Sequence, residues 1–272
     1  MSTAFNHRCG FVLDVKGAQI YYELAGRKEG PALLMLHGGL GHIEDLNSIL
    51  PAVAHEYRVI GIDSRGHGRS TLGQAPLTYE LLQADVEQVL GHLGVGTVTI
   101  IGFSDGGVLG YRLAARSGLG SVSVAKLVTI GATWRLEEGD PVAPILAGVT
   151  ADWWKNKFPE SYSTYQCLNP EPDFDRFARS VVGMWLDTSS LGYPAMAVKS
   201  ILCPTLVVRG QQDHLFSLEE AVELVGLVTA SRLLNILSAG HAAFDDKKEL
   251  FCGALTEFLS SEPATCPSAP PV

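Results

Sequence analysis

The sequence predicts an α/β protein: a mostly parallel, eight-stranded β-sheet with helices on both faces and a small helical cap. Two observations support this fold class. Short apolar, β-branched runs recur along the chain with helical patterns between them, and strands that are apolar on both sides are typical of a parallel sheet covered by helices. The 272 residues also fit within one domain of this class.

The first expected element is an antiparallel hairpin. Residues 11–26 (FVLDVKGAQIYYELAG) alternate in polarity and turn at Gly17, as a hairpin at the edge of a sheet does. The remaining strands are expected in apolar runs at residues 32–38, 57–63, 98–104, 126–132, 204–210 and 232–238.

Two segments between these strands carry clear helix signals. Residues 77–94 place leucines and valines near helical spacing and stop at Gly94. Residues 217–228 open with Ser217 and Glu220, the S-x-x-E pattern of a capping box. We expect both helices to cover the sheet.

The regular alternation lapses at residues 134–199, which hold all four tryptophans, Trp134, Trp153, Trp154 and Trp185. We expect this segment to be an inserted helical cap, so that residues 1–133 and 200–260 form the core. Aromatic side chains in such an insertion often only build its own core. As a group they also suit the apolar wall of a ligand pocket, which a cap over the carboxyl ends of the strands would supply.

The composition excludes several classes of function. A formal net charge of -9 does not suit binding to a nucleic-acid backbone, which requires clustered basic residues. No apolar run approaches the length of a membrane-spanning helix, and the first ten residues lack the apolar region of a secretory signal. We therefore expect a cytoplasmic protein that acts on a small molecule. Residues 261–272, rich in Pro and Ser, are expected to be a flexible tail.

The cysteines and histidines give no sign of a metal or redox centre. The five cysteines are far apart in the sequence and form no C-x-x-C pair, and His214 and the other histidines form no recognisable ligand cluster. We expect no cofactor and no metal. The oligomeric state stays open.

The stretch GFSDGG at residues 102–107 is the strongest chemical motif. It follows an apolar strand and precedes a helical pattern, which is the context in which G-x-S-x-G forms a sharp turn that exposes its serine. Small residues at positions 102 and 106 let the backbones on either side pass closely. We expect Ser104 to be a nucleophile at the top of the sheet.

A serine nucleophile needs a base and a carboxylate to orient that base. In this architecture the chain order is serine, acid, histidine. Asp213 follows the strand predicted at residues 204–210, and His241 follows the strand predicted at residues 232–238. Alone, each residue would be read as an ordinary loop residue. Their order and register predict a Ser104–His241–Asp213 triad.

Acyl transfer also requires donors for the oxyanion that forms on the attacked carbonyl. One is expected from the backbone N–H of Asp105, and the second from the loop HGGLG at residues 37–41. We expect Gly39 to supply the second donor, with Leu40 the next choice. His37 is expected to support this loop through hydrogen bonds.

The motifs LHGGLG, IDSRGHGRS, GFSDGG, GQQD and GH, in this order, resemble those of α/β-hydrolase fold enzymes over nearly the whole chain, apart from the tail and the cap. The resemblance implies that Asp63, Arg65 and His67 of the second motif shape the loop beside the oxyanion region. The alternative, which we favour for each residue, is that it only stabilises a structural turn. The stretch LHGGLGHIEDL, the aspartate after the serine and the position of the cap resemble the valacyclovir hydrolase (biphenyl hydrolase-like) group, which cleaves esters of α-amino acids.

This resemblance implies that Asp105 recognises a substrate ammonium group. The alternative is that Asp105 is simply favoured by the helix dipole in the first turn of a helix. We expect the substrate to contact Asp105, Phe103 and the four tryptophans. The expected function is hydrolysis of a small carboxylic ester; a perhydrolase, a lactonase, a C–C bond hydrolase and a ligand sensor that kept the pocket are the alternatives.

Overall fold

The computed structural model describes residues 2–118, 120 and 122–261. Its strands form one 8-stranded sheet in the order β1-β2-β4-β3-β5-β6-β7-β8. They are β1 (Phe11–Val15), β2 (Ala18–Gly26), β3 (Ala32–Leu36), β4 (Arg58–Ile62), β5 (Thr97–Phe103), β6 (Ser123–Ile130), β7 (Thr205–Gly210) and β8 (Ser231–Ile236).

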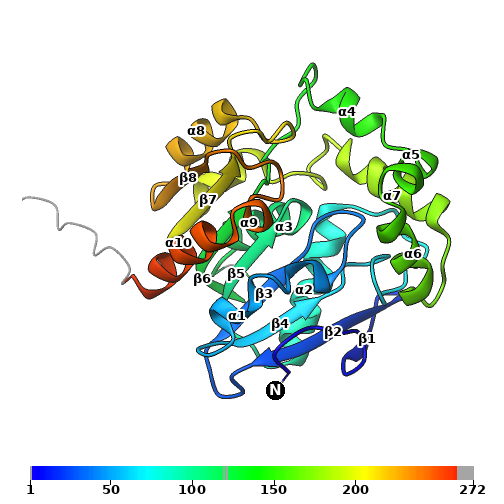
Figure 1. Ribbon diagram of the computed structural model, residues 1–272, viewed down its shortest axis with the longest axis horizontal. Helices are drawn as coiled ribbons and strands as arrows, with labels where there is room; N and C mark the ends of the chain where they lie inside the picture. The colour runs from blue at the N-terminus through cyan, green and yellow to red at the C-terminus, as the bar shows by residue number, and fades with distance from the viewer. Residues whose placement is uncertain (1, 119, 121, 262–272) are drawn as a thin grey trace, which may run out of the picture.

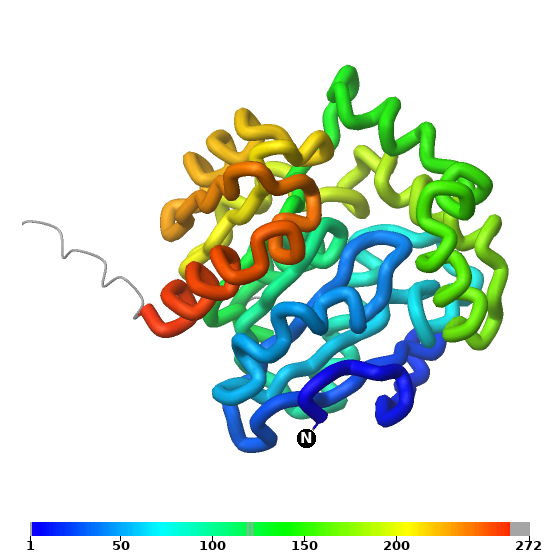
Figure 2. Tube along the Cα trace, viewed as in Figure 1, coloured from blue at the N-terminus to red at the C-terminus, as the bar shows by residue number. Residues whose placement is uncertain are grey.

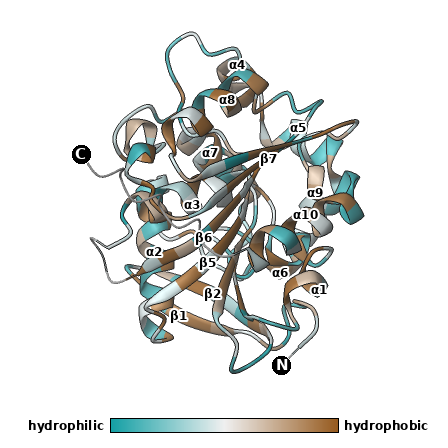
Figure 3. Cartoon of the chain, turned by 90° about the vertical axis from the view of Figure 1, so that its left-hand side faces the viewer, coloured by the Kyte–Doolittle hydropathy of each residue, from teal (hydrophilic) through white to brown (hydrophobic). Residues whose placement is uncertain are grey.

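The sheet confirms the predicted fold class. Strand β1 pairs with β2, and β2 with β4, in antiparallel register, whereas the pairs from β4 through β3, β5, β6 and β7 to β8 are parallel. The predicted hairpin at residues 11–26 therefore lies at one edge. In Figure 3 the central strands are mostly hydrophobic along their length, as expected for strands covered on both faces.

Helices cover both faces of the sheet, as Figure 1 shows. The helices outside the segment between β6 and β7 are η1 (Ile43–Leu46), α1 (Leu50–Val53), α2 (Tyr79–His92), α3 (Asp105–Ala115), α8 (Leu218–Leu227), α9 (Ala243–Asp246) and α10 (Lys248–Ser260). Buried side chains of α2, α3 and α8 belong to one core cluster, and those of α1, α9 and α10 to the other. The capping box predicted at Ser217 and Glu220 is present at the start of α8.

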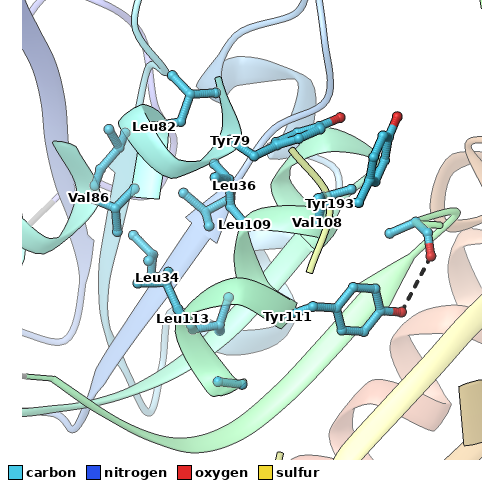
Figure 4. Close-up of a cluster of buried hydrophobic side chains, with 14 of the residues drawn as sticks. Leu34, Leu36, Tyr79, Leu82, Val86, Val108, Leu109, Tyr111, Leu113 and Tyr193 are labelled. Atoms are coloured by element: carbon cyan, nitrogen blue, oxygen red, sulfur yellow. Dashed lines mark hydrogen bonds between the residues drawn. The ribbon is translucent and has the colours of Figure 1, made fainter. Parts of the chain in front are cut away.

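The packing of α2 and α3 on the sheet fixes the position of the amino end of α3. Figure 4 shows Leu34 and Leu36 of β3 packed with Val86 of α2 and Leu109 of α3. All four are buried. Close packing of this kind leaves α3 little freedom to shift, so the residue at its amino end is held in place relative to the sheet.

The segment between β6 and β7 forms α4 (Ala143–Ala147), α5 (Ala151–Lys157), α6 (Pro159–Leu168), α7 (Phe174–Trp185) and η2 (Ala195–Ser200). Helices α4 to α7 lie together on one side of the molecule, and their chain is drawn in green in Figure 2. The apolar face of α7, which includes Phe174, Phe177 and Val181, joins the same core cluster as α2 and α3. The segment between β6 and β7, called the excursion below, is therefore packed onto the sheet domain.

The tail predicted at residues 261–272 lies, apart from Ser261, outside the described residues. In the part of the chain that is described, no helix combines the length and the apolar character needed to cross a membrane.

Candidate active site

Ser104 occupies a strained turn between β5 and α3. Its backbone has φ 50° and ψ -117°, a left-handed conformation that is unfavourable for a residue with a side chain. A Cβ atom at Gly102 would lie 2.2 Å from the Gly106 carbonyl oxygen, and one at Gly106 would lie 2.2 Å from the Leu36 carbonyl oxygen. Only glycine fits at both positions, as the sequence predicted, and the partly exposed Ser104 is lifted above the sheet.

The structure brings the three predicted triad residues into one hydrogen-bonded chain. The Oγ of Ser104 lies 3.1 Å from Nε2 of His241, and Nδ1 of His241 lies 3.0 and 3.1 Å from the two carboxylate oxygens of Asp213. A Ser–His–acid relay of this kind lets the histidine accept the serine proton while the carboxylate holds the ring.

The surroundings of Asp213 keep its carboxyl group ionised. Burial by itself raises the pKa of Asp213, but hydrogen bonding to His241 and the backbone N–H groups of Leu215 and Phe216 outweigh this effect, so the pKa lies below its usual value. The Arg209 guanidinium donates to the backbone oxygens of Asp213 and Phe216 and so fixes the loop that carries the carboxylate. Asp213 can therefore stabilise an imidazolium at neutral pH.

The two segments that carry the candidate oxyanion donors meet next to the serine. Asp105 is the first residue of α3, where backbone N–H groups have no partner within the helix. Gly39 is partly exposed, and its neighbour Gly38 is so near the serine that a Cβ atom there would lie 3.3 Å from the Ser104 Cβ.

The second choice for this donor, Leu40, was wrong. Its N–H donates to Nε2 of His67 at 3.1 Å, and the residue is buried. An N–H group with a buried partner is not free to bind an oxyanion. Of the two predicted residues in this loop, Gly39 is the candidate that remains.

The histidines behind this loop are structural, as expected for His37. Nε2 of His37 accepts the Ser64 N–H at 3.0 Å, and its Nδ1 donates to the Gly38 carbonyl at 2.7 Å. Burial, assisted by the neighbouring His37, lowers the pKa of His67 to about 3. Both rings therefore stay neutral, with each nitrogen committed to one partner.

A cavity of about 250 Å³ opens above Ser104 and His241. Its wall comes from the sheet domain and from the excursion between β6 and β7, and includes Val108, Val142, Ile145, Leu146, Val149 and Phe158. A mostly apolar cavity with a few polar groups is typical of a small-molecule site. A larger cavity of about 520 Å³, lined by Arg112 and Arg116, shares Tyr193 with it but contains none of the triad residues.

Four of the six predicted substrate contacts line this cavity, namely Asp105, Trp153, Trp154 and Trp185. The predicted contact Trp134 was wrong, and Phe103 does not line the cavity. Trp134 is only 2% exposed and belongs to the hydrophobic core, because it packs where the excursion leaves the sheet. Phe103 lies beneath the site, with its ring 5.1 Å from that of His241 and 5.0 Å from that of Phe244.

Five further polar residues line the cavity and were not predicted as site residues: Tyr79, Thr133, Lys157, Tyr193 and His214. Tyr79 falls in a helix that was interpreted only as a cover for the sheet, and its position at the first residue of α2 gives no functional signal. Lys157 ends α5 beside the predicted tryptophans, so the charge next to an aromatic cluster could have been noticed.

Asp105 is a buried carboxyl group in the cavity lining. Its Oδ1 accepts a hydrogen bond from the Tyr79 hydroxyl at 2.7 Å, and both its carboxylate oxygens lie 2.9 Å from Nε1 of Trp185. Burial raises the pKa of Asp105, and the bonds from Trp185 and Tyr79 counter only part of this effect. Both donors are neutral, so neither supplies a positive charge opposite this buried carboxyl group.

Among the residues that the structure describes, no group of three or more His, Cys, Asp or Glu side chains is placed to hold a metal ion.

Comparison with known proteins supports the α/β hydrolase fold. The family model for the alpha/beta hydrolase fold matches residues 31–156. A Haemophilus influenzae protein named as an esterase/lipase is 24% identical over 245 residues, which cover 85% of this chain and 83% of the relative. The 2-hydroxy-6-oxo-6-(2'-aminophenyl)hexa-2,4-dienoic acid hydrolase of Metapseudomonas resinovorans is 25% identical over 267 residues, 91% of this chain and 90% of the relative.

Solved structures agree on the fold. A hydrolase from Pseudomonas aeruginosa superposes with a TM-score of 0.74 at 23% identity, covering 94% of this chain and 100% of that one. The enol-lactonase of Burkholderia xenovorans superposes with a TM-score of 0.73 at 19% identity, covering 92% of this chain and 100% of that one. The chain has the α/β hydrolase fold, and the sequence relatives support the α/β hydrolase superfamily. The resemblance to the valacyclovir hydrolase group stays a prediction.

Proposed function

Starting from the α/β hydrolase fold, we propose that this protein is a serine hydrolase that cleaves a small carboxylic ester through an acyl-enzyme. The observation that carries this proposal is the continuous hydrogen-bonded chain from Ser104 through His241 to Asp213 at the floor of an apolar cavity. The esterase/lipase name of a relative that aligns with most of the chain is consistent with it.

The proposed reaction has two halves. The Oγ of Ser104 attacks the ester carbonyl and gives its proton to Nε2 of His241, while the N–H groups of Gly39 and Asp105 bind the oxyanion. The tetrahedral intermediate collapses, the C–O bond breaks, and the alcohol leaves with the proton from His241. Water then attacks the acyl-enzyme with His241 as base, and the acid is released as Ser104 regains its proton. Asp213 stays ionised throughout.

Residues 134–199 are proposed to act as the cap of this site. Three of the tryptophans in this segment, Trp153, Trp154 and Trp185, supply part of the cavity wall. A cap of this kind excludes water from the reacting carbonyl and supplies apolar area to the substrate.

A second, finer proposal is that the preferred ester carries an α-amino group. Asp105 places a buried carboxylate on the cavity wall directly after the nucleophile, and its two hydrogen-bond donors are neutral. An ammonium group would supply the missing opposite charge in a site where water screens little. This follows the predicted resemblance to the valacyclovir hydrolase group.

The fold also hosts other reactions that use the same residues. One full-length relative is named as a hydrolase of a dienoic acid and one structural neighbour as an enol-lactonase. A C–C bond hydrolase or a lactonase would use Ser104 with a different leaving group, and a perhydrolase would use a different acceptor. A ligand sensor would bind without turnover.

The test compares turnover of short-chain esters, lactones and vinylogous diketones by the wild type and by Ser104→Ala, with Ser48→Ala as the matched control. Ser48 lies outside the cavity lining and its hydroxyl is buried without a partner among the described residues. We expect ester turnover that Ser104→Ala removes by a factor of at least about 10⁴ and that Ser48→Ala leaves intact. Exclusive turnover of lactones or diketones would replace the ester proposal, and stabilising binding without turnover would support a sensor.

A further inference from the structure

Trp185 is the point at which the excursion between β6 and β7 meets the turn of the nucleophile. It is the last residue of α7, it is 8% exposed, and its indole Nε1 lies 2.9 Å from each carboxylate oxygen of Asp105. Asp105 is also the residue whose backbone N–H is one proposed oxyanion donor. The indole therefore binds the side chain of the first residue of α3.

The same indole contacts the segment that carries the other proposed donor. A Cβ atom at Gly39 would lie 2.6 Å from Cζ2 of Trp185 and 2.5 Å from Oδ2 of Asp105. The Gly39 backbone, the Asp105 carboxylate and the Trp185 ring are thus packed with no space for a side chain between them. Three segments that are distant in the sequence meet at this contact.

We infer that Trp185 is a positioning residue that holds the two halves of the oxyanion hole together and makes the hole depend on a seated cap. This inference rests on the proposed function. Gly39 and Asp105 lie on separate segments, the loop after β3 and the start of α3. Their N–H groups must converge on one oxygen, and the geometric tolerance for such donors is a few tenths of an ångström. Trp185 packs against one segment and hydrogen-bonds to the other.

Neighbouring contacts hold Trp185 itself in place. The Tyr193 hydroxyl donates to the Trp185 carbonyl at 3.0 Å, and the Tyr193 ring lies 5.0 Å from that of Tyr79. Tyr79 in turn donates to Asp105 at 2.7 Å. Figure 4 shows Tyr79 and Tyr193 side by side at one end of the buried cluster. Movement of α7 away from the sheet would break the indole bond to Asp105 and remove the packing against Gly39.

The experiment compares Trp185→Phe with Trp134→Phe. Both changes shorten a buried tryptophan of the same segment, but Trp134 does not line the cavity and packs in the core. For each variant, kcat, KM and Tm are measured with the ester that the wild type prefers. Two further measurements are the Ki of a boronic acid, which forms a tetrahedral oxyanion on Ser104, and the Kd of the intact ester in the Ser104→Ala background.

We expect Trp185→Phe to lower kcat by roughly ten- to a hundredfold, the range that small displacements of catalytic groups produce, with KM changed by less than about threefold. The boronic acid Ki should rise in proportion to the loss in kcat/KM, while the Kd of the ester stays constant, because only the oxyanion depends on the two donors. Trp134→Phe should lower Tm and leave the kinetic constants near those of the wild type.

Three results would overturn the inference. Equal losses in both variants would indicate general destabilisation. A higher KM with unchanged kcat would make Trp185 only a substrate contact. An unchanged boronic acid Ki would show that Trp185 does not affect the oxyanion hole.

If the wild type cleaves no ester, the proposed function fails by itself. The rate at which a fluorophosphonate labels Ser104 then decides the inference. Labelling slowed only in Trp185→Phe supports it, and absent or equal labelling refutes it.

Discussion

The backbone N–H of Leu40 donates to Nε2 of His67 at 3.1 Å, and Nδ1 of His67 donates to the Arg65 carbonyl at 3.0 Å. This pair of bonds links the loop after β3 to the loop after β4. Leu40 has a left-handed backbone, with φ 57°, which a branched side chain adopts only where its surroundings enforce it. His67 therefore holds the loop in a conformation in which the Leu40 N–H is occupied, which leaves Gly39 as the proposed donor.

Replacement of His67 should lower turnover by the same factor at every pH tested, because His67 does not titrate in that range. We expect His67→Leu to lower kcat by roughly ten- to a hundredfold, because Leu40 loses its acceptor and the loop relaxes. His67→Gln should retain more activity, since its amide oxygen can accept the same N–H. Because burial lowers the pKa of His67 to about 3, the ratio of wild-type to His67→Leu activity should be constant from weakly acidic to alkaline pH. A ratio that varies there would contradict a permanently neutral His67.

Gly39→Ala should damage catalysis far more than folding. Its Cβ atom would come within 2.5 Å of Asp105 Oδ2 and 2.6 Å of Trp185, so both must move and the oxyanion donors separate. We expect kcat to fall by roughly a hundredfold, as it does when one donor is lost. Gly91→Ala in α2 is the control, because a Cβ atom there meets nothing within 4 Å; it should raise stability by up to about 1 kcal/mol. Activity assays and urea unfolding of both variants check this, and near-normal turnover by Gly39→Ala would exclude Gly39 as the donor.

The sequence was sufficient to predict the sheet and the convergence of Ser104, His241 and Asp213, because both follow from the order of strands and loops along the chain. Apolar strands between helices predict buried parallel strands, and in such a sheet the carboxyl ends of β5, β7 and β8 lie at one edge. Ser104, Asp213 and His241 each follow one of these strands, so their convergence follows from topology. The capping box of α8 is a local sequence signal.

The errors concern contacts that no local pattern encodes. The Leu40 N–H is occupied by His67, which is 27 residues away in the sequence. Trp134 and Trp185 both belong to an aromatic-rich segment, yet one is in the core and the other lines the cavity. The choice depends on how residues 134–199 fold over the sheet, which the spacing of apolar residues does not specify. Tyr79 is missed for the same reason.

The amino-terminal segment should stabilise the fold in a pH-dependent manner through His7. Its ring nitrogens lie 2.5 Å from a Glu44 carboxylate oxygen and 2.8 Å from one of Asp63. Burial lowers the pKa of His7, but the hydrogen bonds and charges of Asp63 and Glu44 outweigh it, and the pKa is raised above 6.5. A raised histidine pKa contributes stability that is complete below the unfolded value and is lost as pH rises through the folded value. The pKa of Asp63 lies below 3.8, so its contribution is lost only in stronger acid.

The contribution of His7 should therefore be largest between pH 3.8 and 6.5. His7→Gln should lower the free energy of unfolding by about 1–3 kcal/mol in that range, and by less at alkaline pH. Urea unfolding at about pH 5.5 and about pH 9 measures both values. His55→Gln, at a histidine whose side chain is 64% exposed, should change little at either pH. A His7 effect that grows with pH would contradict the ion-pair interpretation.

The charge of Asp105 gives the proposed preference for amino esters a pH window. Because burial raises the pKa of Asp105 above 3.8, the carboxylate is charged above that raised value and neutral below it. The α-amino group of a substrate is charged below about pH 8. For two esters matched except for an α-amino group, the ratio of kcat/KM should therefore be highest between these limits. We expect a ratio of more than about tenfold that falls toward one on either side.

Taking this ratio removes the pH dependence of the triad, since both esters use the same groups. Asp105→Asn is the informative variant, because its amide oxygen can still accept a hydrogen bond from Trp185 or Tyr79 while the charge is gone. If Asp105 binds an ammonium group, this variant should cleave both esters at similar rates at every pH. If wild type and variant show the same ratio, Asp105 serves only to hold Tyr79, Trp185 and the start of α3 together, and the substrate is a neutral ester.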